Sequence, residues 1–213
     1  MTESHFAYPI VLNLSGRRVV VVGGGEVALR KARALADAGA RVRVVAPKLA
    51  PGFAEDGRFE CVAAGYEKQR LEGARVAVAA TDDEAINRRI AEDARSAGVL
   101  VNVVDRPELC DFIVPAQVRR GDLVVAVSTG GAAPALAKRL RERLEKEFGP
   151  EYAVLLEALR EVRDDLKKRK VSPETRRRVF ERLAEDDIVD AACQGADALR
   201  QAVAKVVAGL LRK

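Results

Sequence analysis

The stretch Arg17–Ala28 reads RRVVVVGGGEVA and decides the fold of the first half of the chain. Arg17–Val22 ends in four consecutive valines, which is typical of a buried strand. Three glycines follow it, and Glu26–Ala38 then carries apolar residues at helical spacing. Strand, glycine turn and helix in this order match the pattern G-x-G-x-x-G/A, with Ala28 in the last place.

This glycine turn predicts a dinucleotide-binding loop. Gly23 permits a tight turn, Gly25 lets a pyrophosphate approach the backbone, and Ala28 keeps the helix close to the strand. The start of the helix adds unpaired N–H groups and a partial positive charge. The alternative is a glycine turn without a ligand. The residues that we expect to bind the cofactor here are Gly23, Gly24, Gly25, Glu26 and Val27.

The end of the second expected strand, Arg41–Ala46, departs from the usual pattern. An acidic residue normally holds the adenosine ribose at this point, but the chain has Ala46-Pro47-Lys48. Backbone groups around Pro47 and Lys48 would have to replace the acid. Lys48 could favour a 2′-phosphate, so the residues alone leave NAD and NADP both open.

Strands and helices continue to alternate. Phe59–Ala63, Arg75–Ala79 and Val99–Val103 are β-rich. Thr81-Asp82-Asp83-Glu84 has the form of a capping box, so we expect a helix from there to about Ala97. This alternation predicts an α/β domain with a parallel sheet and helices on both faces.

The pattern changes after Asp105. Phe112–Arg119 and Leu123–Ser128 are expected to form a hairpin, and Pro134 opens a helix that runs to about Phe148. The rest is helical in pattern, with Ser172-Pro173-Glu174 as a helix start. We therefore expect three parts: an α/β domain over 1–113, a strand-and-helix segment over 114–149, and a small all-α domain over 150–213.

The amino-acid composition excludes several classes of protein. Of 213 residues, 48% are hydrophobic, enough for a packed core. No apolar run reaches the roughly 18 residues that a membrane span needs, and the first residues do not resemble a secretory signal. Three cysteines are an odd number, which favours a reducing cytoplasm. One histidine and no Cys-x-x-Cys pair leave few ligands, so we expect no metal site.

The net charge of +5 is uneven. Residues 1–137, 138–182 and 183–213 have balances of +1, +5 and −1. A basic middle stretch attracts polyanions, although a solvated helix face explains it equally simply.

Three segments together resemble a known family: GGGEVALRKAR from Gly23, NVVDRPELCDFIVPA from Asn102, and LVVAVSTGGAAPALA from Leu123. In this order and spacing they are similar to the precorrin-2 dehydrogenase family, which also forms the amino-terminal module of siroheme synthases. Ala79-Ala80-Thr81-Asp82-Asp83 fits as well. The resemblance covers most of residues 8–148.

The resemblance implies a Rossmann domain, a dimerisation segment over 114–149 and a helical carboxy-terminal domain, assembled as a homodimer. It implies NAD-dependent oxidation of precorrin-2 to sirohydrochlorin, and some members also insert ferrous iron. We expect neither membrane nor nucleic acid as a partner, and we expect the preceding methylation to come from another chain.

The resemblance implies functional roles for individual residues at the matching positions of this sequence. Asp105 matches the aspartate regarded as central to catalysis, although an aspartate before Arg106-Pro107 could simply cap a turn. On the cofactor side the matching residues are Pro47, Lys48, Thr81 and Asn102. On the tetrapyrrole side they are Ser128 and Thr129, with Gly130 and Gly131 of the same loop. Lys138 is added from the basic excess of residues 138–182, which would attract a substrate with many carboxylates. Ala133 stands where some members have a serine, which weakens any role for that hydroxyl.

Two other functions stay open at this point. Arg176-Arg177-Arg178 would suit an NAD(H)-binding redox sensor with a basic helical domain that contacts DNA, although no clear helix-turn-helix is present. A dehydrogenase with a different, small substrate is the other option. An iron site from Asp105 and Cys110 would lack the usual three or four ligands, so we interpret Cys110 as a small buried hydrophobe.

Overall fold

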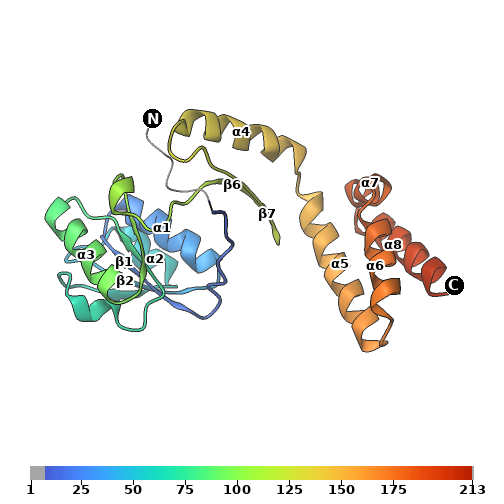
Figure 1. Ribbon diagram of the computed structural model, residues 1–213, viewed down its shortest axis with the longest axis horizontal. Helices are drawn as coiled ribbons and strands as arrows, with labels where there is room; N and C mark the ends of the chain where they lie inside the picture. The colour runs from blue at the N-terminus through green and yellow to red at the C-terminus, as the bar shows by residue number, and fades with distance from the viewer. Residues whose placement is uncertain (1–7, 213) are drawn as a thin grey trace. The chain divides into compact units, whose positions relative to one another are not determined.

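The computed structural model describes residues 8–212, and the chain divides into two compact units between Val114 and Pro115 (Figure 1). Each unit is described by itself. The elements of the first unit are β1 (Arg18–Val22), α1 (Glu26–Asp37), β2 (Arg41–Val45), α2 (Pro51–Asp56), β3 (Glu60–Val62), the 3-10 helix η1 (Lys68–Leu71), β4 (Val76–Ala79), α3 (Glu84–Ser96), β5 (Leu100–Val103) and the 3-10 helix η2 (Pro107–Leu109).

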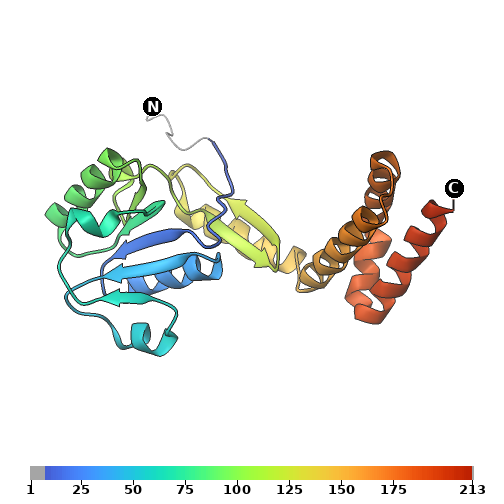
Figure 2. The ribbon, with the colours of Figure 1, turned by 90° about the horizontal axis from the view of Figure 1, so that it is seen from below.

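The first unit is built on one parallel sheet with the strand order β3-β2-β1-β4-β5 (Figure 2). From β1 the chain moves outward to β2 and β3, and then returns to place β4 on the other side of β1. Val22 at the end of β1 accordingly pairs with both Val45 and Ala79. The order of strands reverses at β1, which is where open α/β sheets bind ligands. The α/β prediction is confirmed.

The valine run in β1 faces two hydrophobic cores. Val19 and Val21 pack with α1 and α2, whereas Val20 and Val22 pack with α3 on the opposite face. Since all four side chains are almost fully buried, the strand carries apolar residues at every position instead of alternating with polar ones.

The expected capping box at the start of α3 is wrong. The helix begins at Glu84, and its cap is Asp83, whose carboxylate accepts hydrogen bonds from the N–H groups of Ala85 and Ile86. Thr81 lies two residues after the end of β4, so the chain must still turn before a helix can start. The short helix α2 was not predicted, because its six residues are too few to show a periodicity.

The elements of the second unit are β6 (Ala116–Arg120), β7 (Leu123–Val127), α4 (Pro134–Glu147), α5 (Glu151–Lys168), α6 (Pro173–Leu183), α7 (Asp186–Gln194) and α8 (Ala196–Leu211). The predicted hairpin is confirmed, with Arg120 opposite Leu123 and Gly121 at φ 57°. Its first strand starts at Ala116 instead of Phe112, because Pro115 has no N–H to donate to a ladder.

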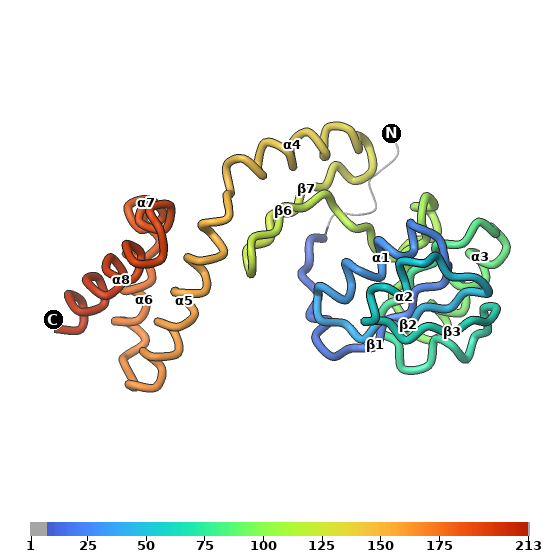
Figure 3. The backbone as a smooth tube through the Cα atoms, turned by 180° about the vertical axis from the view of Figure 1, so that it is seen from behind, coloured from blue at the N-terminus to red at the C-terminus, as the bar shows by residue number. Residues whose placement is uncertain are grey.

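The helices α5–α8 share one hydrophobic core (Figure 3). Leu166, Val179, Leu183 and Ile188 are almost fully buried in it. Ser172 caps α6 through a hydrogen bond from the Thr175 N–H, as its position before Pro173 predicted. Within residues 8–212, no helix combines the length and the apolar character that crossing a bilayer requires.

We predict that Ile90→Ala destabilises the first unit by about 2–5 kcal/mol, because Ile90 of α3 is fully buried against the sheet and its truncation leaves a cavity. Ile10→Ala is the matched control: Ile10 is 58% exposed, so the change in unfolding free energy should stay within about 0.5 kcal/mol. Urea unfolding followed by circular dichroism measures both. Equal effects of the two substitutions would contradict the packing described here.

Candidate functional site

Two of the three loop glycines are required by the packing of the protein itself. Gly23 has φ 135°, and its N–H donates to the Val45 carbonyl at 3.0 Å. A Cβ atom at Gly23 would overlap the carbonyl oxygen of Ala80, and one at Gly24 would overlap that of Lys48. The loop therefore lies directly against the segments that follow β4 and β2.

Gly25 differs, because a Cβ atom there would meet open space. Its backbone is extended (φ −86°, ψ −177°), and it occupies the cap position of α1 without any side chain to satisfy the first N–H groups of the helix. Glu26 and Val27 are exposed, whereas Ala28 is fully buried against the sheet. An uncapped helix start with free space in front of it fits the phosphates of a dinucleotide.

The loop after β2 completes one side of this site. The N–H of Ala50 donates to the Gly24 carbonyl at 2.8 Å, so the two loops are joined by their backbones. Pro47 and Lys48 are both exposed. No carboxylate lies between β2 and Lys48, so ribose recognition here would depend on backbone groups and on the Lys48 side chain.

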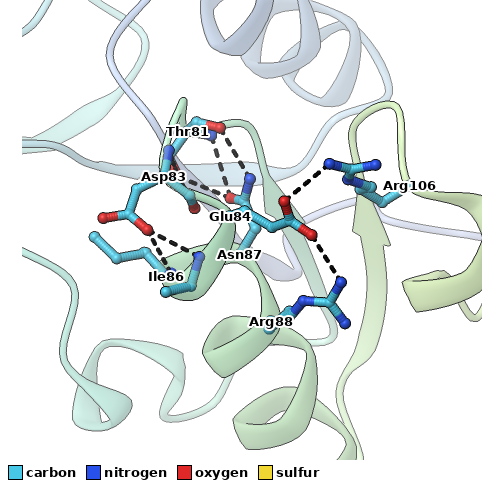
Figure 4. A network of polar contacts seen from close by, with 8 residues as sticks. Thr81, Asp83, Glu84, Ile86, Asn87, Arg88 and Arg106 are labelled. Atoms are coloured by element: carbon cyan, nitrogen blue, oxygen red, sulfur yellow. Dashed lines mark hydrogen bonds and ion pairs between the residues drawn. The ribbon is translucent and has the colours of Figure 1, made fainter.

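Thr81, after β4, belongs to a hydrogen-bond network with α3 (Figure 4). Its hydroxyl donates to the Asn87 amide oxygen at 2.8 Å, and the Asn87 amide nitrogen donates back to the Thr81 carbonyl at 2.9 Å. Asn87 is only 7% exposed. A buried side chain of α3 therefore fixes the loop at the end of β4.

A second network joins the loop after β4 to the loop after β5 (Figure 4). Glu84, the first residue of α3, forms ion pairs with Arg88 at 2.7 Å and with Arg106 at 3.0 Å. The hydrogen bond from Arg88 and the charge of Arg106 lower the pKa of Glu84. All three side chains are about half exposed, so these contacts orient the loop more than they stabilise it.

Asp105 lies in a tight turn directly after β5. Its φ is 58°, and the turn is closed by a hydrogen bond from the Arg106 N–H to the Val103 carbonyl at 3.3 Å. Aspartate tolerates this left-handed conformation better than most residues. Among residues 8–212 no hydrogen bond or ion pair uses its carboxylate, and η2 starts at Pro107 without a side-chain cap. Asp105 is thus exposed and does not act as a cap for the turn that follows.

Asn102 lies in β5 itself and is buried, with 7% exposure. Its amide nitrogen donates to the Phe112 carbonyl at 2.9 Å. These contacts are with the protein, so a role of Asn102 toward a cofactor stays a prediction. The sequence analysis did not identify Lys31 of α1. Burial lowers the pKa of this lysine, whereas the charge of Asp105 acts in the opposite direction.

The residues expected on the tetrapyrrole side lie in the second unit, between β7 and α4. Ser128 and Thr129 accept hydrogen bonds from the N–H groups of Gly130 and Ala133, both at 3.1 Å. Gly130 and Gly131 have positive φ values of 61° and 88°. Lys138 is exposed in the second turn of α4. The loop thus presents hydroxyls, backbone and a cation at one helix start.

The described residues contain no group of three or more His, Cys, Asp or Glu side chains that could hold a metal ion. Cys61, Cys110 and Cys193 are unpaired. His5 lies outside the residues that the structure describes.

Comparison with known proteins identifies the first unit. Residues 10–116, half of the chain, match the family model described as "Putative NAD(P)-binding". The chain belongs to this NAD(P)-binding family. Residues 120–147 match the model for the central part of a sirohaem biosynthesis protein. The resemblance to the amino-terminal module of siroheme synthases is therefore confirmed.

Individual relatives agree with this assignment. The chain is 44% identical over 209 residues to a siroheme synthase of Stutzerimonas stutzeri, covering 96% of this chain and 45% of the relative. It is 50% identical over 176 residues to the siroheme synthase of Azotobacter vinelandii, and this match covers 81% of this chain and 38% of the relative. The chain thus spans less than half of these curated relatives. The solved structure of SirC, a precorrin-2 dehydrogenase, is similar to this chain with a TM-score of 0.75 and 28% sequence identity. The match covers 93% of this chain and 100% of the SirC chain.

We predict that Gly25→Asp abolishes dinucleotide binding and leaves the fold intact. The new side chain has room and can cap α1, so stability should be equal or slightly higher. Its carboxylate would occupy and repel the phosphate position, weakening binding at least about 100-fold, or roughly 2.7 kcal/mol. Calorimetric titration with NAD and thermal melting measure the two effects.

The contrasting variant is Gly24→Ala. Its Cβ atom would overlap the Lys48 backbone, so this small substitution should lower the melting temperature where Gly25→Asp does not. Normal NAD binding by folded Gly25→Asp would contradict the loop assignment.

Proposed function

We propose that this protein oxidises precorrin-2 to sirohydrochlorin with NAD, a step toward siroheme. The observation that carries the proposal is the uncapped start of α1 beside the reversal point of the sheet, within a chain that resembles SirC over 93% of its length. The siroheme synthases that it matches support the same pathway. The three unpaired cysteines support a cytoplasmic location.

The cofactor would lie along the carboxyl edge of the sheet. The N–H groups at the start of α1 would hold its pyrophosphate, and the loop carrying Pro47 and Lys48 would contact the adenosine side. Thr81, after the neighbouring strand β4, would reach the nicotinamide side. A bound NAD supplies the hydride acceptor that such an oxidation requires.

Asp105 is the proposed catalytic residue. Oxidation of precorrin-2 removes a hydride and a proton, and a carboxylate oxygen of Asp105 would accept that proton or stabilise positive charge on the macrocycle. An exposed carboxylate without partners among residues 8–212 is available for this role. Its place after β5 puts it at the ligand edge of the sheet.

The loop between β7 and α4 is the proposed contact for the substrate's carboxylates. Ser128 and Thr129 hydroxyls, the Gly130-Gly131 backbone and Lys138 offer hydrogen-bond donors and one positive charge, which suit an acidic tetrapyrrole. We propose no nucleic-acid partner, because the sequence shows no clear helix-turn-helix and Arg177, of the three consecutive arginines, already pairs with Glu181. Iron insertion remains an implication of the resemblance.

We further propose that the protein is a homodimer formed through residues 114–149. Val124 of β7 is 42% exposed and Leu136 of α4 is 50% exposed. A two-stranded sheet is marginal by itself in water, which supports pairing of this segment with a second copy.

We predict that sedimentation shows a species of about twice 23.0 kDa. Val124→Glu should shift it toward monomer, because a carboxylate cannot be buried without a partner. The control Val154→Glu, on the similarly exposed Val154 of α5, should leave the mass unchanged. A monomeric wild-type protein would contradict the proposal.

We predict that Asp105→Ala lowers kcat for precorrin-2 oxidation about 10²–10⁴-fold, the usual contribution of a general base. The NAD dissociation constant should change little, because the glycine loop is untouched. Glu108→Gln, which removes an exposed carboxylate from the same loop, is the control and should keep wild-type turnover. Tetrapyrrole absorption follows the reaction, and full activity of Asp105→Ala would exclude the proposed catalytic role.

A further inference from the structure

The turn that carries Asp105 is attached to the outer edge of the sheet. Strand β5 is an edge strand, so one side of it has no neighbouring strand. The chain folds back along this side after Asp105. The Val101 N–H donates to the Asp111 carboxylate at 2.9 Å, and the Asp111 N–H donates to the Val101 carbonyl at 2.8 Å. The backbone groups of an exposed edge are thereby satisfied.

Cys110 satisfies the backbone of Val103 in a similar way, two residues further along β5. Its sulfur accepts a hydrogen bond from the Val103 N–H at 3.1 Å. The thiol lies 3.2 Å from the Val103 carbonyl and 3.3 Å from the Arg106 carbonyl, and its proton can be donated to either. Burial raises the pKa of this thiol. Cys110 therefore stays protonated and keeps its capacity to donate at neutral pH.

The backbone groups that contact the Cys110 sulfur belong to the two ends of the turn that carries Asp105. Val103 precedes the turn and Arg106 follows it, so one sulfur atom bridges both ends. Asp105 has no side-chain partner among residues 8–212, and its position is therefore set only by its backbone. Other contacts also hold this turn. The Val104 N–H donates to the Ala79 carbonyl at 2.9 Å, and the Arg106–Glu84 ion pair is about half exposed and contributes little.

We propose that Cys110 is a positioning residue: its thiol bridges Val103 and Arg106 and holds the Asp105 carboxylate in place for proton transfer. This inference rests on the proposed function. Cys110 also packs, partly buried, against the core beside α3, as its interpretation as a small hydrophobe expects, and the proposal adds a polar role to that packing. A displacement of about 1 Å at a reacting group can reduce a rate by roughly 10²-fold, so a weak thiol bond has a measurable effect here.

The test compares Cys110→Ala and Cys110→Ser with Cys61→Ser and Cys193→Ser, which change the two exposed cysteines. In the full-length protein, Cys110→Ala should lower kcat about 10- to 100-fold, with the KM for precorrin-2 and the NAD dissociation constant nearly unchanged. Cys110→Ser should restore part of kcat, because a hydroxyl also donates and accepts. Both controls should retain wild-type values. Wild-type kcat in Cys110→Ala, or a rise in KM alone, would overturn the inference.

A second measurement separates this inference from the proposed function. Amide hydrogen exchange of the peptide covering residues 100–112 should be faster in Cys110→Ala than in wild type, and intermediate in Cys110→Ser. Equal exchange would overturn the bridge even where kcat falls. A wild-type protein that does not oxidise precorrin-2 while exchange follows this order would refute the proposed function and leave the bridge between Val103 and Arg106 intact.

Discussion

The whole site depends on bare backbone at the end of β1. Gly23 and Gly24 have no side chains because the carbonyl groups of Ala80 and Lys48 occupy that space. Gly25 has none although space is available, and the first N–H groups of α1 consequently remain open to an anion. Packing of the protein thus explains two glycines, and the proposed binding of a dinucleotide would explain the third.

The reversal of strand order at β1 gives this loop its neighbours. Since β2 and β4 flank β1, the loops after all three strands lie at the same edge of the sheet. Hydrogen bonds within that edge fix the loops: Ala50 bonds to Gly24 of another loop, whereas Thr81 and Arg106 bond to Asn87 and Glu84 of α3. In the proposed function, a cofactor would bind to a surface whose shape these bonds set, and Asp105 would face it from the turn after the edge strand β5.

In the proposed site, Asp105 depends on the Cys110 thiol, which contacts the two ends of its turn. Cys110 and Asp111 satisfy the outer N–H groups of β5, a role that a neighbouring strand fills elsewhere in the sheet. Because this edge is closed by side chains, a single substitution at Cys110 would change both the hydrogen bonds of the Asp105 turn and a contact with the core.

The amino-acid sequence by itself determined the parallel α/β architecture, the glycine loop and the helical carboxy-terminal region, because valine runs, glycine spacing and helix periodicity are local patterns. It also placed Asp105 after a strand. Only the tertiary structure decided that Asp83 and not Thr81 caps α3, since this depends on how far the chain must turn after β4. The contacts of Cys110 were likewise invisible in sequence, because they arise from a loop that folds back on an edge strand.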